Sequence, residues 1–218
     1  MRASIFTICI LASGCHAKFK RAAPFIDDIN VQVVTSGGPY VQLGKLQAPT
    51  NSNGESDLIG EIAAAAVNVT QAFREVNQTD RIYNAVDIND VNAYMTAGLA
   101  DTLADGPPFA YSDNSADAML QLDVVSYGVN VPYLGAPGEF TYSVQARMYN
   151  TGGERVYRKN LTCTIGLGDP STAAVVFGTV NNVQSLNEMT DAEINDAFRN
   201  AAAYCGQKFV VKMRKHAS

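Results

Sequence analysis

The sequence predicts an α+β domain with a mainly antiparallel sheet and with helices packed on one face of that sheet. Three observations predict this class: two helical patterns in the first half, a region of alternating apolar residues from 118 to 165, and one helical pattern after it. Helices grouped before and after a run of strands are typical of α+β proteins. With 218 residues, 47% of them hydrophobic and 17% charged, the chain is long enough to bury a core. We expect a single domain over residues 28–218.

The amino-terminal half is expected to contain two strands and two helices. Residues 29–33 alternate in polarity with period two, and residues 40–46 form a weaker strand pattern after a Gly-Gly-Pro turn. Apolar residues at helical spacing then predict one helix over about residues 57–76 and a second over 87–103. Gly106, followed by two prolines, marks the end of the second helix.

Three strands are expected next, joined by tight turns into an antiparallel meander. Residues 118–131 alternate, but the alternation changes phase after Val124, which indicates a β-bulge. Residues 140–148 and 155–165 each follow a turn that contains glycine. One face of such a meander is buried and the other is wet.

The chain then has a long connection and a last helix. Residues 166–189 are a long connection, and loops of this length are either functional or mobile. The apolar patch in it is a possible partner-contact loop, and its residues are Ala173, Val175, Val176 and Phe177. Thr190 and Glu193 match a capping box, so the last helix begins there.

Cys163 and Cys205 are a candidate disulfide. Cys163 falls on the buried face of its strand, and Cys205 falls on the apolar stripe of the last helix. A helix packed on the sheet brings the two thiols together, and an exported protein meets an oxidising compartment. The alternative is two separate buried thiols, because free cysteine packs well in cores.

The first fifteen residues have the pattern of a secretory signal. Arg2 supplies a positive charge, residues 5–11 are apolar, and small residues precede Cys15. This order resembles the lipobox of bacterial lipoproteins, although Ala12 stands where that motif more often has a larger aliphatic residue. The resemblance implies that residues 1–14 are a signal peptide and that Cys15 becomes the lipidated amino terminus. The alternative is an ordinary signal peptide in which the cysteine is coincidental.

Residues 15–27 are expected to be a short tether that keeps the domain close to its membrane. About 10 extended residues reach only about 35 Å. Its cations Lys18, Lys20 and Arg21 either touch anionic head groups or are simply solvated. His16 follows the cysteine where an aspartate, in Gram-negative lipoproteins, retains the protein at the inner membrane. The resemblance therefore implies the outer membrane, with the domain facing the periplasm.

Catalytic and metal chemistry has few candidate residues. The two histidines, His16 and His216, lie near the ends of the chain and outside the predicted fold. We therefore expect no catalytic triad, no metal site, no cofactor and no enzymatic activity. A net charge of −5 and a pI near 5.0 argue against nucleic-acid binding.

The order of elements, taken with the lipobox, is similar to that of small accessory lipoproteins of the Gram-negative envelope, such as the ABC-type transport auxiliary lipoproteins. The resemblance implies a non-enzymatic, membrane-anchored module that binds an envelope protein in transport or assembly. The alternative is a periplasmic carrier of a lipid or another apolar ligand, which requires a large closed cavity lined by apolar side chains.

Overall fold

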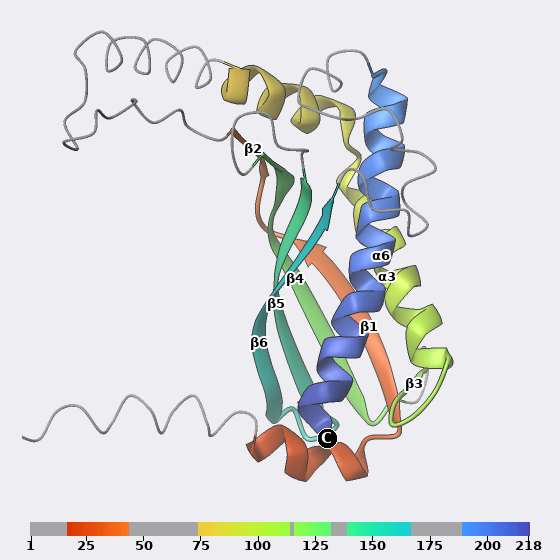
Figure 1. Cartoon of the computed structure of the whole chain (residues 1–218). Coiled ribbons are helices and arrows are strands. Elements are labelled where there is room, and N and C mark those ends of the chain that lie inside the picture. The colour runs from red at the N-terminus through yellow and green to blue at the C-terminus, as the bar shows by residue number, and fades with distance from the viewer. Residues whose placement is uncertain (1–16, 44–73, 114–115, 132–138, 167–188) are drawn as a thin grey trace, which may run out of the picture.

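The structure is a computed structural model that describes residues 17–43, 74–113, 116–131, 139–166 and 189–218. A six-stranded sheet forms its centre, and helices lie along one side and across both ends (Figure 1). The strands are β1 (Asp28–Thr35), β2 (Pro39–Leu43), β3 (Ala110–Tyr111), β4 (Ala118–Val131), β5 (Glu139–Asn150) and β6 (Arg155–Gly166). The helical segments are residues 17–22, η1 (Ala23–Phe25), residues 74–85, α3 (Ile88–Ala104) and α6 (Asp191–Ala217).

The prediction of an α+β fold is confirmed, but the prediction of a mainly antiparallel sheet is wrong. The strand order is β3-β1-β4-β5-β6, and β2 also pairs with β4. The pairs β1–β3, β1–β4 and β2–β4 are parallel, whereas β4–β5 and β5–β6 form the expected antiparallel meander. The first two strands return to β4 through crossovers that include helices, and such connections leave strands parallel. The alternation of apolar and polar residues within a strand does not show whether its neighbour runs parallel or antiparallel to it.

β1 and β2 follow one another along the same edge of β4. β1 pairs with residues 118–124 of β4, and β2 pairs with residues 127–131. Between them, the amides of Ser36 and Gly37 both donate to the carbonyl oxygen of Val124, at 3.1 Å. A Cβ on Gly37 would lie only 1.7 Å from the carbonyl oxygen of Val125, so only glycine fits here. The bulge predicted after Val124 is confirmed at this point.

The predicted starts of the two long helices are confirmed. Asp87 caps α3, because its side chain accepts a hydrogen bond from the amide of Asn89 at 2.8 Å. Thr190 and Glu193 form the capping box of α6, with a distance of 2.7 Å between the Thr190 amide and Glu193 Oε2. Most of the helix predicted over residues 57–76 lies outside the described residues, and the helix that the structure describes there covers residues 74–85.

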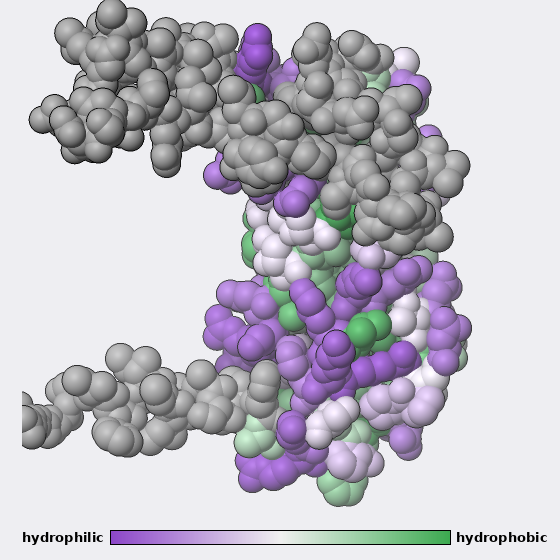
Figure 2. All heavy atoms as spheres, viewed as in Figure 1, coloured by the Kyte–Doolittle hydropathy of each residue, from purple (hydrophilic) through white to green (hydrophobic). Residues whose placement is uncertain are grey.

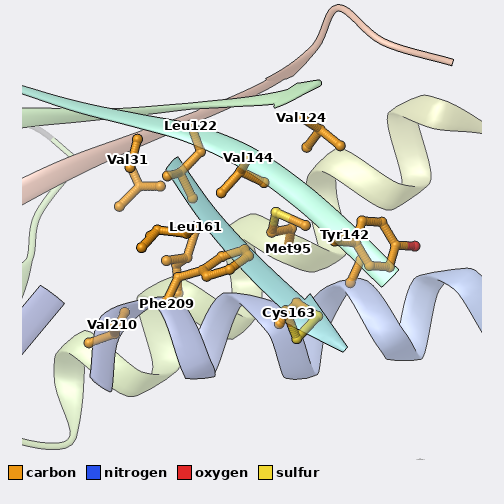
Figure 3. Close-up of a cluster of buried hydrophobic side chains, with 14 of the residues drawn as sticks. Val31, Met95, Leu122, Val124, Tyr142, Val144, Leu161, Cys163, Phe209 and Val210 are labelled. Atoms are coloured by element: carbon orange, nitrogen blue, oxygen red, sulfur yellow. A yellow bond between two sulfur atoms is a disulfide. The ribbon is translucent and has the colours of Figure 1, made fainter. Parts of the chain in front are cut away.

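The core lies between the sheet and the helices α3 and α6. α3 contacts β1, α6 contacts β5 and β6, and the two helices contact each other. A Cβ on Gly98 would lie 2.0 Å from the carbonyl oxygen of Ala203, so glycine allows this close approach of the helices. Met95, Leu161 and Phe209 fill the space between sheet and helices (Figure 3). None of the described helices is both long and apolar enough to cross a lipid bilayer.

Cys163 of β6 and Cys205 of α6 are joined by a disulfide, with their Cα atoms 5.6 Å apart (Figure 3). The bond links residues that are 42 positions apart in the chain. It therefore fastens the last helix to the edge strand of the meander, in place of the two separate thiols that the sequence left open.

Candidate functional site

The first described residues, 17–26, pack on the folded domain. Residues 17–22 form a helix that continues into η1 and lies across one end of the sheet (Figure 1). The ring of Phe19 in this helix is fully buried, with centroid distances of 4.6 Å to Tyr157 and 6.0 Å to Phe109. Ala23 and Ile26 are buried as well. We refer to residues 17–26 as the amino-terminal segment.

This arrangement differs from the tether that the sequence predicts over residues 15–27. Phe19, Ala23 and Ile26 follow one another at helical spacing, so the segment has an apolar face and a charged face. Burial of that apolar face docks the segment on the core. The signal was present in the sequence, but the three nearby cations favoured interpreting the segment as a linker.

The carboxyl-terminal end of α6 meets the same end of the sheet. α6 extends to Ala217, so His216 lies within the fold rather than outside it as expected. The distance between the Tyr157 hydroxyl and His216 Nδ1 is 2.8 Å. Burial raises the pKa of Tyr157 well above its usual range. Tyr157 thus links the amino-terminal segment, through Phe19, to the last turn of α6.

A cleft of about 540 Å³ opens between the amino-terminal segment and the turn that joins β5 to β6. Charged side chains and apolar ones both line it: Lys18, Arg21, Ala22, Phe25, Ile26, Asp117, Asn150, Thr151, Glu154 and Val156.

The two carboxylates in this cleft already have partners. Lys18 Nζ lies 2.8 Å from Glu154 Oε1, and this hydrogen bond lowers the pKa of Glu154 below its usual value. Asp117 Oδ2 accepts hydrogen bonds from the amides of Asp27 and Asp28 at 3.0 and 3.2 Å. Asp117 therefore holds the start of β1, and Glu154 holds Lys18. Their contacts are structural, and the pair does not resemble a general acid and base.

Three residues of the amino-terminal segment point away from the core. Lys20 and Arg21 are exposed, and neither forms an ion pair with a carboxylate among the described residues. Phe25 is 82% exposed, the largest value among the exposed large hydrophobic residues of the part of the chain that the structure describes. Hydrophilic residues cover much of the lower half of the molecule in the view of Figure 2.

The opposite end of the sheet is crossed by the helix of residues 74–85 (Figure 1). Polar contacts connect this helix to β2: the amide of Leu43 donates to Glu75 Oε1 at 2.6 Å, and that of Val41 donates to Thr79 Oγ1 at 3.1 Å. Val76 and Tyr83 lie seven residues apart on this helix and are 59% and 70% exposed. Residues seven apart share one face of a helix, so this end also presents apolar side chains to solvent.

Several residues singled out in the sequence lie outside the described residues. These are Cys15 and the apolar patch of Ala173, Val175, Val176 and Phe177. Among the described residues, no group of three or more His, Cys, Asp and Glu side chains is placed to hold a metal ion.

No protein-family model matches the chain, and no curated protein matches it in sequence. Comparison with solved structures finds chains that resemble it weakly. The hypothetical protein CT253 from Chlamydia trachomatis is 8% identical with a TM-score of 0.38, over 83% of this chain and 95% of that one. The lipoprotein GNA1162 from Neisseria meningitidis is 15% identical with a TM-score of 0.25, over 75% of this chain and 99% of that one. At such low values these likenesses carry no argument about function, which rests on the residues of this chain.

Proposed function

We propose that this protein is a lipoprotein of the outer membrane, anchored by a lipid on Cys15 and facing the periplasm. In this proposal it is a non-enzymatic module that binds an envelope protein in transport or assembly. The lipid supplies the location, and the folded domain supplies the binding surface.

The observation that carries the proposal is the short path from Cys15 to the core. Residue 17 already belongs to a helix, and Phe19 is fully buried. Two residues span at most about 7 Å. An acyl chain on Cys15 would therefore hold the amino-terminal end of the domain against the bilayer, without an intervening linker.

The opposite end of the sheet is then the end that points away from the membrane, and it supports the proposed protein partner. Tyr83 and Val76 form an exposed apolar pair on one face of the 74–85 helix. Exposed aromatic residues of this kind are enriched at protein interfaces.

The alternative of a carrier for an apolar ligand is less well supported. Within the described residues, the space between helices and sheet contains large, fully buried side chains, among them Tyr142, Phe198 and Phe209. The cleft at the amino-terminal end is lined by four charged side chains, which an acyl chain would have to desolvate.

Anchoring is tested by labelling with radioactive palmitate and by membrane fractionation of cells that produce the full chain. Cys15→Ser should lose the label and leave the outer-membrane fraction. The matched control is Cys9→Ser, which changes another cysteine of the signal and should behave like the natural sequence. A Cys15→Ser protein that keeps both its label and its membrane location would contradict the proposal.

The partner is tested by site-specific photo-crosslinking in intact cells. A photoreactive amino acid at position 83 should give discrete adducts with an envelope protein. The control position is Val211, which is also exposed but lies on α6. Equal adducts from both positions, or none from position 83, would count against the proposed binding surface.

A further inference from the structure

The amino-terminal segment combines features that suit a membrane surface. Lys20 and Arg21 are exposed cations, and Phe25 exposes 82% of its surface four residues after Arg21. The opposite face of the same segment is buried through Phe19. We call Lys20, Arg21 and Phe25 the amino-terminal surface.

Charges around this surface leave the two cations available. Glu154 faces the segment from the β5–β6 turn but is paired with Lys18. Asp117 faces it from the start of β4 but accepts two backbone hydrogen bonds. Asp27 follows the segment and is exposed, and the last turn of α6 adds the exposed cation Lys215.

We propose that the amino-terminal surface lies directly on the anionic head groups of the bilayer, with the cations of Lys20 and Arg21 at the phosphates and the ring of Phe25 among the head groups. This inference rests on the proposed anchoring at Cys15. It goes further, because it gives the folded domain a lipid contact of its own and hence one fixed orientation on the membrane.

Lipid fits this surface for reasons of position and of charge. Arg21 lies six residues after Cys15, and the helix that contains it begins at residue 17 among the described residues. A lipid on Cys15 would therefore bring the amino-terminal surface to the bilayer. Basic residues are attracted to anionic membrane surfaces over about a Debye length. The apolar side chains of interfacial helices, Phe among them, lie about 5–10 Å deep at the boundary between head groups and acyl chains, and we expect the same depth for Phe25.

The first test uses tryptophan fluorescence, because the chain contains no tryptophan. Phe25→Trp and, as the matched control, Tyr83→Trp each introduce a single indole at an exposed aromatic position. The lipidated proteins are reconstituted into vesicles whose phospholipids carry bromine near the head-group end of the acyl chains. At the expected depth, bromine should quench the Phe25→Trp emission by at least about half and leave Tyr83→Trp almost unquenched. Equal quenching of the two variants, or none for Phe25→Trp, would overturn the proposal.

The second test separates this contact from the lipid anchor. In the full chain carrying Cys15→Ser, co-sedimentation is measured with vesicles of phosphatidylglycerol and phosphatidylcholine, at low ionic strength. Each cation near such a surface is expected to change partitioning about fivefold, so Lys20→Glu with Arg21→Glu should lower it at least about tenfold. The matched control reverses two other exposed cations, Arg74→Glu with Lys208→Glu, and should lower partitioning much less.

Equal losses in the two double variants would overturn the proposal, as would absence of binding in the Cys15→Ser protein. Loss of binding to phosphatidylglycerol vesicles at high salt is expected, because the attraction is electrostatic. If Cys15 is not lipidated, the palmitate labelling shows it separately. The co-sedimentation result does not depend on that outcome, because it uses the protein without its anchor.

Discussion

The two ends of the sheet are closed by helices in different ways. At the amino-terminal end, the segment of residues 17–26 is held by a buried ring, that of Phe19 against Tyr157 and Phe109. At the opposite end, the 74–85 helix is connected to β2 by polar contacts from Glu75 and Thr79, besides the buried side chain of Ile82. Both ends thus combine burial with polar contacts, but the buried group is an aromatic ring at the amino-terminal end and the smaller aliphatic side chain of Ile82 at the other.

This difference matters for the roles proposed for the two ends. A lipid anchor holds the chain at residue 15. The segment that follows must therefore be firmly attached to the core if the anchor is to hold the whole domain at the membrane. Loss of an aromatic side chain from a core costs several kcal/mol, whereas a single hydrogen bond contributes about 1 kcal/mol. The amino-terminal end has the attachment that a fixed anchor requires.

The largest expected effect is that of Phe19→Ala. Removing a fully buried ring should lower the free energy of unfolding by about 4 kcal/mol, measured by urea denaturation. Phe25→Ala is the matched control, because Phe25 is 82% exposed, and it should change stability by less than about 0.5 kcal/mol. Similar values for the two variants would contradict the docking of the amino-terminal segment.

Removal of the disulfide should weaken the domain without distinguishing its ends. Cys163→Ser with Cys205→Ser is expected to cost about 3 kcal/mol, because the closed loop between the two cysteines restricts the unfolded chain. Hydrogen exchange should then rise in both the amino-terminal segment and the 74–85 helix. Faster exchange at one end alone would show that the disulfide stabilises that end and not the whole domain.

Thr79→Val tests the polar attachment at the opposite end. The substitution keeps the side-chain shape but removes the acceptor of the Val41 amide, so it should cost about 1 kcal/mol. Asp80→Asn, at an exposed position of the same helix, is the control and should be close to neutral. A cost as large as that of Phe19→Ala would remove the contrast between the two ends.

The smallest effect concerns Lys18 and Glu154, whose ion pair is exposed. Lys18 lowers the pKa of Glu154, so the pair's contribution to stability is present at neutral pH and is lost as the pH falls through that lowered pKa. In an NMR titration, Lys18→Met should raise the pKa of Glu154. Glu193, whose pKa is lowered by its hydrogen bonds with Thr190, is the internal control and should not change. An unchanged Glu154 pKa would show that the pair does not form in solution.

The meander and the two long helices were predictable because each carries a strong local signal. Residues 140, 142, 144, 146 and 148 alternate, and all five are buried in the structure. Apolar residues at helical spacing predicted α3, the capping box marked the start of α6, and the change of phase after Val124 marked the bulge. These features depend only on neighbours in the chain.

The sheet order and the amino-terminal segment were not predictable in the same way. The parallel pairing of β1 with β4 depends on a crossover, and the alternation in residues 29–33 is the same for either direction. Phe19 gives only a weak pattern, because it is a single aromatic residue among Lys18, Lys20 and Arg21. Its role depends on Tyr157 and Phe109, which are distant in sequence. The position of His216 was not predictable for a similar reason. It depends on the contact between the last turn of α6 and Tyr157, which is distant in sequence.

The central claim, that the domain is held at a membrane through Cys15, is tested most directly by mass spectrometry of the protein purified from membranes. We expect the chain to begin at Cys15 and its first tryptic peptide, residues 15–18, to carry the added mass of a lipid. An unmodified Cys15, or a chain that still contains residues 1–14, would contradict it.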